Sequence, residues 1–297
     1  MEARQNNSPC DPSAYDNLLQ SLGCTFVREV ANRRGSALFQ VRRGNTLLAL
    51  KLSVSNADDG VYDPIELLYR EASVLRRLGT LADNLYIDHG VFENRHWLLL
   101  RWLDGETVSE PCKVYRAIED DRLRHGTFLN LFANILRKYV AVHTAGFMHG
   151  DVQTHHVFMT SEKPALIDWG LGKHIDDKDY IYRGGLVHFV SPETAKGMLI
   201  KAPSIPYDMT TEMYAIAAMF FILYTGKTPV YYGSNDVLSV PLEDKLKFVA
   251  RGDIVSFKKI GIKPFPELES RLRKCLNSDK DERLSSIAFL QEIQAIR

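Results

Sequence analysis

The sequence predicts an α+β fold in two parts, a small antiparallel sheet with one helix and then a larger, mainly helical part. Short segments of strand-like composition fill most of the chain before Asp104, and longer segments with apolar residues at helical spacing dominate after Gly105. We therefore expect one bilobal domain over residues 15–297, with lobes at 15–103 and 104–297. Residues 1–14 are polar and contain Asn, Ser and Pro, which is typical of a disordered tail.

The first lobe is expected to contain five strands and one helix. The strand-like segments lie at residues 26–30, 37–41, 46–53, 86–94 and 96–103. The Gly-Asn pair in "RRGN" predicts a hairpin between the second and third of these strands. Residues 63–79 are expected to form the helix, because Pro64 suits a first helical turn and Gly79 suits a helix end.

The second lobe is expected to consist mostly of helices. Residues 127–146 form a long amphipathic pattern that ends at Gly146. Further helices are predicted at residues 209–226, 242–251, 265–276 and 284–296. The stretch 106–126 either connects these parts in solvent or lines an acceptor site, and we favour the connector.

The composition argues against several classes of function. Lys plus Arg and Asp plus Glu each number 37, so nothing global favours a nucleic-acid or anionic-membrane partner. The four cysteines are scattered without a CxxC pair, which indicates reduced thiols in a cytoplasmic protein. The N-terminus lacks the apolar core of a secretory signal, and the longest apolar run, 214–224, is too short to span a bilayer. The sequence gives no indication of an oligomeric state.

Residues that carry chemistry occur in a definite order along the chain. Lys51 lies in a predicted strand and Glu71 lies in the predicted helix. Asp151 follows a His-Gly pair, and Asp168 lies in "IDWG". Each residue alone has an ordinary structural reading, such as a surface charge or a turn residue. With "SPE" at residues 191–193 and an arginine near the C-terminus, the order and spacing leave coincidence a poor explanation.

This pattern resembles the protein kinase superfamily, as a divergent eukaryotic-like Ser/Thr kinase fold, over nearly the whole chain. The matching stretches are "LALK" for the lysine strand, "LLLRWLDGE" for the hinge, "HGDVQTHHVF" for the catalytic loop and "DWG" for the metal-binding motif. "GLVHFVSPE" resembles the end of the activation segment (residues 168–193), and "EMYAIAAMFFILYTGKTPV" resembles the buried helix that follows it. The resemblance implies a phosphotransferase that uses ATP and Mg²⁺.

The resemblance gives each of four residues a role. Phosphoryl transfer depends mostly on positioning and charge neutralisation. Lys51 would hold the α and β phosphates, and Glu71 would fix Lys51 by an ion pair. Asp168 would bind Mg²⁺ through its carboxylate, and Asp151 would orient the acceptor hydroxyl and take its proton.

Nucleotide contacts are also implied by the resemblance. The backbone of Arg101 and Leu103 in the hinge would meet the adenine edge. The glycine-rich phosphate loop is nearly absent, because Gly35 is the only glycine in "ANRRGSALFQ". Ser36 and the neighbouring amides are the remaining candidates for capping the nucleotide.

The catalytic loop and the activation segment depart from the family pattern. Gly150 replaces the arginine that pairs with a phosphorylated activation segment, and residues 168–190 contain no Ser or Thr. We infer that switching by Ser/Thr phosphorylation of this segment is absent. Gln153 replaces the lysine beside the γ-phosphate, and Leu186 replaces the threonine that contacts this lysine and the catalytic acid.

His156 stands where the family has the asparagine that binds a second metal ion. An imidazole suits Mn²⁺ or Zn²⁺ better than Mg²⁺. Three interpretations stay open: His156 is a ligand that favours Mn²⁺, Asp168 alone holds one metal ion, or the site is inactive. His149 is expected to pack in the core and His155 to point away from the site. A separate zinc site from these three histidines is disfavoured in so tight a loop.

The leading interpretation is a kinase that phosphorylates Ser or Thr hydroxyls of a protein or peptide, with a biosynthetic precursor peptide as one option. The "SPE" stretch favours this branch, in which Glu193 and Arg283 would form a buried ion pair. A small-molecule phosphotransferase, similar to the aminoglycoside and choline enzymes, is an alternative supported by "HGD" and "IDWG". A pseudokinase that binds partners without catalysis is a second alternative, supported by Gln153 and His156.

Overall fold

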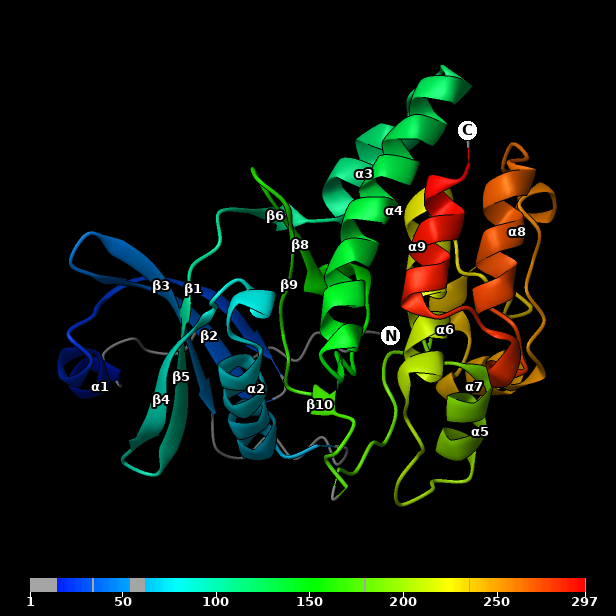
Figure 1. Cartoon of the computed structure of the whole chain (residues 1–297). Helices are drawn as coiled ribbons and strands as arrows, with labels where there is room; N and C mark the ends of the chain where they lie inside the picture. The colour runs from blue at the N-terminus through cyan, green and yellow to red at the C-terminus, as the bar shows by residue number, and fades with distance from the viewer. Residues whose placement is uncertain (1–14, 34, 54–61, 179, 235, 297) are drawn as a thin grey trace. The chain divides into compact units, whose positions relative to one another are not determined.

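The computed structural model describes residues 15–33, 35–53, 62–178, 180–234 and 236–296 (Figure 1). The tail expected over residues 1–14 lies outside the described residues. By their internal contacts, the residues divide into two compact units. The first unit holds the chain up to Asp104 together with Trp169–Gly172, and the second holds Gly105–Asp168 and the chain from Lys173 onward.

The first unit is a five-stranded antiparallel sheet accompanied by two helices. Its elements are α1 (Asp16–Ser21), β1 (Thr25–Arg33), β2 (Ser36–Arg43), β3 (Thr46–Ser53), α2 (Pro64–Leu78), β4 (Tyr86–Phe92) and β5 (Arg95–Arg101). The strand order is β1-β2-β3-β5-β4. The pair Arg43↔Thr46 leaves Gly44 and Asn45 as a two-residue turn, and the positive φ of Gly44 (57°) suits glycine. The expected hairpin is therefore confirmed.

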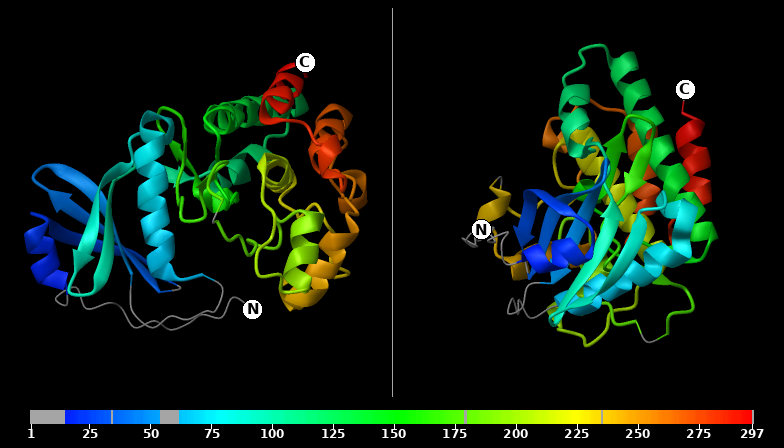
Figure 2. Two further views of the ribbon diagram at one scale, coloured as in Figure 1. Left: turned by 60° about the horizontal axis from the view of Figure 1, so that its bottom comes forward. Right: turned by 90° about the vertical axis from the view of Figure 1, so that its left-hand side faces the viewer.

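Helix α2 begins and ends where its sequence signals lie. The Asp63 carboxylate accepts a hydrogen bond from the Ile65 N–H at 2.8 Å, Pro64 occupies the first turn, and the helix ends before Gly79. Its buried face packs against β3, β4 and β5, as Figure 2 shows. Glu71 is a charged residue on this buried face, with only 3% of its surface exposed.

Helix α1 was not expected from the sequence. Its Leu18 and Leu19 are buried in a cluster with Phe39 of β2 and Trp97 of β5. A six-residue helix is too short to show a periodic pattern, so packing against the sheet rather than intrinsic propensity accounts for it.

The second unit is mainly helical, as predicted, and the α+β fold with an antiparallel sheet followed by helices is confirmed. Its main helices are α3 (Ser109–Arg116), α4 (Asp121–Thr144), α5 (Pro192–Leu199), α6 (Met209–Thr225), α7 (Leu242–Arg251), α8 (Pro266–Cys275) and α9 (Ser286–Gln294). Its short strands are β6 (Gly105–Thr107), β7 (Phe147–Met148), β8 (Val157–Thr160), β9 (Pro164–Leu166) and β10 (Lys173–His174).

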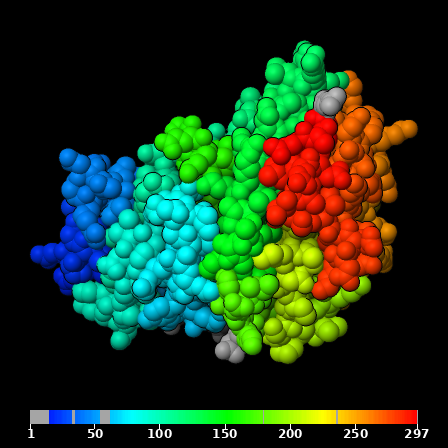
Figure 3. Space-filling view, in the orientation of Figure 1, coloured from blue at the N-terminus to red at the C-terminus, as the bar shows by residue number. Residues whose placement is uncertain are grey.

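Helix α6 forms the centre of this unit. The Asp208 carboxylate caps it by accepting from the Thr211 N–H at 2.9 Å, and Gly226 ends it with a φ of 71°. Nearly every side chain between these ends is buried, so the apolar run seen in the sequence is a core helix. Within the described part of the chain, no helix is both long and apolar enough to cross a bilayer. On the face shown in Figure 3, α9 lies between α4 and α8.

The expected start of the long helix, residue 127, is wrong. Helix α4 begins at Asp121, because the Asp120 carboxylate accepts from the Leu123 N–H at 2.8 Å and the chain tolerates Gly126 within the helix. Part of the expected connector also forms α3, whose Cys112 is fully buried. Intrinsic helix propensity did not predict the start of α4 or the presence of α3. A side-chain cap stabilises the first, and tertiary packing stabilises the second.

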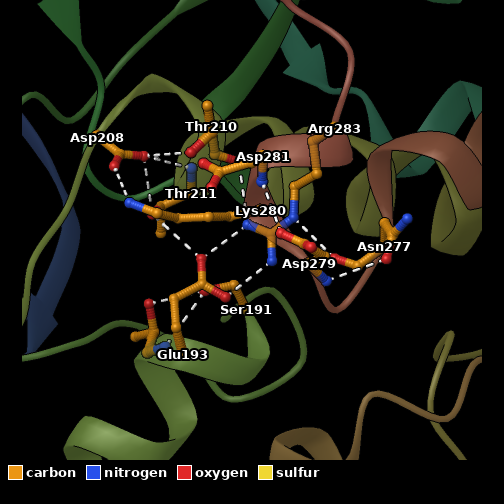
Figure 4. Close-up of polar contacts among 11 residues, drawn as sticks. Ser191, Glu193, Asp208, Thr210, Thr211, Asn277, Asp279, Lys280, Asp281 and Arg283 are labelled. Atoms are coloured by element: carbon orange, nitrogen blue, oxygen red, sulfur yellow. Dashed lines mark hydrogen bonds and ion pairs between the residues drawn. The ribbon is translucent and has the colours of Figure 1, made fainter.

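A bidentate ion pair fastens α5 to the segment before α9 (Figure 4). Arg283 Nη1 and Nη2 donate to Glu193 Oε1 at 2.7 Å and Oε2 at 2.8 Å, and Arg283 Nε donates to the Asn277 carbonyl at 2.8 Å. No part of the Arg283 side chain is exposed. Nearby, Lys280 Nζ donates to Asp208 Oδ2 at 3.0 Å, and both of these side chains are more than two-fifths exposed. The contact that the resemblance implies is therefore present.

Removal of the Arg283 side chain is expected to destabilise the protein by about 3 kcal/mol, because Arg283→Ala leaves the Glu193 carboxylate without its buried partner. Lys280→Ala is the matched control, since it breaks an exposed ion pair and should cost less than about 1 kcal/mol. Urea unfolding followed by circular dichroism measures both changes. Equal losses would contradict this ranking.

The same ion pair should make stability depend on pH. Burial by itself raises the pKa of the Glu193 carboxyl, but the hydrogen bonds and charge of Arg283 outweigh burial and hold that pKa below 4.5. Because the folded-state pKa is lowered, the stabilisation is present above about pH 4.5 and is lost as the pH falls through the folded-state pKa. The stability difference between the wild type and Glu193→Gln should therefore shrink on acidification. A difference that stays constant in urea titrations down to about pH 3 would refute the assignment.

Candidate active site

The first unit holds the lysine and the glutamate that the resemblance pairs. Lys51 Nζ lies 2.6 Å from Glu71 Oε2 and 2.9 Å from Glu71 Oε1. Lys51 lies in β3, opposite Leu38 of β2 and Leu98 of β5. Both partners are largely buried, so the ion pair fixes the lysine ammonium group.

Glu71 also binds the stretch Trp169–Gly172, which belongs to the same unit. The Trp169 N–H donates to Glu71 Oε1 at 3.4 Å. The Trp169 side chain has no exposed surface, and a Cβ atom on Gly172 would lie 3.2 Å from both the Trp169 ring and Val74. One buried carboxylate thus contacts both the Lys51 ammonium group and the Trp169 amide.

The predicted nucleotide-contacting residues occupy ordinary backbone positions in the first unit. Arg101 ends β5, and its N–H donates to the Leu85 carbonyl at 2.8 Å, so a contact from Arg101 to adenine would need its carbonyl. Leu103 follows the strand and is half-buried. Ser36 begins β2 and pairs with Arg33 and Ser53 in the sheet. The adenine and phosphate contacts of Arg101, Leu103 and Ser36 stay predictions.

In the second unit, the HGD loop (residues 149–158) holds Asp151 between β7 and a short 3-10 helix, Thr154–His156. The Asp151 side chain is 23% exposed. Gln153 Nε2 donates to Asp151 Oδ2 at 3.0 Å. Gln153 therefore gives the carboxylate a neutral hydrogen-bond donor at the position where the family pattern has a charged one.

His156 lies between the two aspartates of the second unit. His156 Nδ1 is 2.9 Å from the Asp151 carbonyl oxygen, and Nε2 is 3.3 Å from Asp168 Oδ2. The Ile167 N–H donates to the His156 carbonyl at 3.0 Å, which brings the two short strands β8 and β9 together beside this pair. Because a carbonyl only accepts, Nδ1 carries a proton, and Nε2 presents either a second proton or a lone pair towards Asp168.

Asp168 itself has a left-handed backbone, with a φ of 64°. Non-glycine residues adopt this region uncommonly, and Asp is among the types that tolerate it best. Its carboxylate is about half exposed, at 49% of the side-chain surface. The unusual backbone thus leaves Asp168 next to His156 with a carboxylate that solvent can reach.

Glu212 of α6 is a buried carboxylate that binds two backbone amides of the HGD loop. Glu212 Oε1 accepts from the His149 N–H at 3.0 Å and from His143 Nε2 at 2.9 Å. Glu212 Oε2 accepts from the Gly150 N–H at 2.8 Å and from the Tyr207 hydroxyl at 2.9 Å. Glu212 has no exposed surface, so four donors satisfy a carboxylate that water does not reach.

The protonation states of this network follow from its contacts. Burial by itself raises the pKa of the Glu212 carboxyl, but hydrogen bonding and charge from His143, with His149, outweigh burial and lower that pKa below its usual value. Burial lowers the pKa of His149 to about 4, so its imidazole is neutral near pH 7. His149 Nε2 donates to the Ile167 carbonyl at 3.0 Å, which places His149 in the core as predicted.

Sequence reasoning did not assign roles to Glu212, His143 and Tyr207. The available signal was an acidic residue at the head of a run of apolar residues, because a buried helix keeps a charge only where donors satisfy it. His155 is exposed, as expected of a residue that points away from the site.

The chain matches the model of the protein kinase domain over residues 35–294. It belongs to the protein kinase family. The match includes β2 to β5 and α2 of the first unit and nearly all of the second unit, and it spans every site residue predicted above.

Three curated relatives of this kinase domain come from bacteria. It is 24% identical over 179 residues to a probable serine/threonine-protein kinase of Clostridium acetobutylicum, covering 59% of this chain and 25% of that protein. It is 25% identical to the probable serine/threonine-protein kinase PknB of Lactococcus lactis, covering 63% and 28%. It is 23% identical to the probable serine/threonine-protein kinase PkwA of Thermomonospora curvata, covering 54% and 20%. The matched parts thus amount to 20–28% of each relative's length.

The family implies a divalent cation, and two side chains of the second unit suit one. Among the described residues, no group of three His, Cys, Asp or Glu side chains is arranged to hold a metal ion. Cations that bind nucleotide phosphates need fewer protein ligands, because one or two side chains suffice beside phosphate and water oxygens. Asp168 Oδ2 and His156 Nε2 lie 3.3 Å apart, close to the separation of about 3 Å for neighbouring ligands of one ion. These two residues would hold the cation.

His156→Asn is expected to weaken Mn²⁺ binding at least about tenfold and to shift the preference towards Mg²⁺, because an amide oxygen is a harder ligand than an imidazole nitrogen. His155→Asn is the matched control, since His155 is exposed and its replacement should leave binding unchanged. Electron paramagnetic resonance titration of Mn²⁺ measures the affinity without turnover. An unchanged affinity in His156→Asn would exclude His156 as a ligand.

Proposed function

We propose that this kinase domain transfers the γ-phosphoryl group of ATP to Ser or Thr hydroxyls of a protein or peptide. The observation that carries the proposal is the fixed Asp151 carboxylate, which Gln153 orients while Glu212 anchors the adjoining backbone. The three bacterial relatives are all named as probable serine/threonine-protein kinases, which supports the same acceptor class.

In the proposed reaction, Asp151 accepts the proton of the acceptor hydroxyl as that oxygen forms its bond to the γ-phosphorus. The bond between the γ-phosphorus and the bridging oxygen breaks, and ADP leaves with the electron pair. Lys51 would hold the α and β phosphates, since Glu71 fixes its ammonium group at 2.6 Å. A divalent cation held by Asp168 and His156 would neutralise phosphate charge during this transfer.

The positive charge beside the γ-phosphate needs another source in this kinase domain. Gln153 donates a hydrogen bond to Asp151 but carries no charge. A cation held by Asp168 and His156 would then supply positive charge near the transferred group. We therefore expect turnover to depend more steeply on the metal than on the residue at position 153.

Asp151→Asn should lower turnover by at least about 1,000-fold while leaving ATP affinity within about twofold, because the amide keeps the size of the carboxyl group and one acceptor oxygen but cannot accept the proton. Asp168→Ala should instead weaken binding of the metal–nucleotide complex. Labelled ATP with peptide and metabolite pools, in Mg²⁺ and in Mn²⁺, measures acceptor class and rate together.

Each outcome of that assay has a distinct meaning. Label on peptides supports the protein kinase proposal, whereas label only on metabolites favours the small-molecule phosphotransferase. No turnover with either ion, together with ATP binding that Asp168→Ala leaves unchanged, would favour the pseudokinase. Turnover that survives Asp151→Asn would show that another group accepts the proton.

A further inference from the structure

Tyr182 is a core residue within the activation segment. Only 3% of its surface is exposed, and its ring centroid lies 4.2 Å from that of Tyr207 and 6.2 Å from that of Tyr180. The Tyr182 carbonyl accepts from the Ile205 N–H at 2.7 Å. Backbone and ring are thus both fixed, so the phenol hydroxyl has a defined position.

That hydroxyl borders the same small space as the Asp151 carboxylate. A Cβ atom on Gly185 would lie 3.3 Å from the Tyr182 hydroxyl oxygen and 3.7 Å from Asp151 Oδ1. Asp151, Tyr182, Gly185 and Leu186 line one pocket of the second unit. The absence of a side chain at Gly185 leaves room for the hydroxyl and the carboxylate oxygen to face each other.

The two carboxylate oxygens of Asp151 have different neighbours. Oδ2 accepts from Gln153 Nε2 at 3.0 Å, and Oδ1 is the oxygen that faces the space shared with Tyr182. Leu186 in the same pocket is apolar and offers no side-chain donor. A phenol is neutral near pH 7 and can donate one hydrogen bond.

We propose that Tyr182 is a positioning residue for Asp151, with its hydroxyl donating a hydrogen bond to Oδ1. Gln153 and Tyr182 then hold the two oxygens from opposite ends and fix the plane of the carboxylate. The effect on rate rests on the proposed function, whereas the contact itself does not.

The aromatic packing also explains how the activation segment is held in place without a phosphorylated Ser or Thr. Tyr182 packs on Tyr207, whose hydroxyl donates to Glu212 Oε2 at 2.9 Å. Glu212 in turn accepts from the Gly150 N–H at 2.8 Å, one residue before Asp151. Tyr182 therefore connects the activation segment to Asp151 in two ways. Its ring does so indirectly, through Tyr207 and Glu212, and its hydroxyl does so directly by the proposed hydrogen bond.

Tyr182→Phe tests the hydroxyl while keeping the ring. The variant should lower kcat about tenfold, leave the KM for ATP within about twofold and lower the thermal midpoint only by the small amount that the loss of one hydrogen bond implies. Tyr180→Phe makes the same chemical change two residues earlier and should lower kcat by less than about twofold. An unchanged kcat in Tyr182→Phe, or an equal loss in Tyr180→Phe, overturns the proposal.

Gly185→Ala tests the same contact by placing a methyl group beside the Tyr182 hydroxyl and Asp151 Oδ1. The new methyl group would crowd the Tyr182 hydroxyl at 3.3 Å, so kcat should fall several-fold in the wild-type background. In Tyr182→Phe the hydroxyl is gone and the methyl has room, so Gly185→Ala should cause no further loss. Losses that multiply across the two sites contradict the proposal.

An unfolding cycle tests the contact without turnover. Tyr182→Phe should lower the urea midpoint in the wild type but not in Asp151→Ala, because the acceptor is then absent. Equal shifts in both backgrounds overturn the contact. A wild type that transfers no phosphate would refute the proposed function alone, since this cycle still reports on the hydrogen bond.

Discussion

The buried carboxylate of Glu212 is the interaction on which the second unit depends. It accepts hydrogen bonds from two consecutive backbone amides, His149 and Gly150, and from the side chains of His143 and Tyr207. Two neighbouring amides that share one acceptor group allow little freedom to the residue that follows. A buried ion without these donors would be strongly unfavourable, so the fold and the position of the HGD loop are secured together.

The side-chain hydrogen bond from Gln153 to the Asp151 carboxylate comes from a neutral donor. Gln153 contacts one oxygen, and the proposed contact of Tyr182 would hold the other. Gly150 supplies only its backbone amide, to Glu212. Aromatic packing and hydrogen bonds thus hold the HGD loop and the activation segment, which agrees with the lack of Ser and Thr between residues 168 and 190.

Much of the fold could be predicted because local signals and packing agree. Pro64 and Gly79 bound a helix that the structure places within a residue of each, and the Gly44 turn gives the predicted hairpin. The ion pair of Lys51 and Glu71 was implied by the resemblance to protein kinases. These features depend on residues whose types are strongly constrained by backbone geometry or by charge.

The rest could not be predicted because it depends on contacts distant in sequence. Three of the four donors to Glu212, from His143, His149 and Gly150, lie 62 to 69 positions away in the chain, and no local pattern reports which buried donors meet an acidic residue. The start of α4 was missed because an Asp cap outweighed a glycine within the first turns. The role of Tyr182 was not predicted, because its burial depends on packing against Tyr207, which lies farther along the chain.

Hydrogen exchange measured by mass spectrometry on the wild type and Glu212→Gln tests the central claim most directly. If Glu212 anchors the loop, peptides that contain the amides of His149 and Gly150 should lose protection in the variant, while peptides from β1 to β5 exchange as before. Unchanged protection of the loop amides in a folded Glu212→Gln protein would contradict the account.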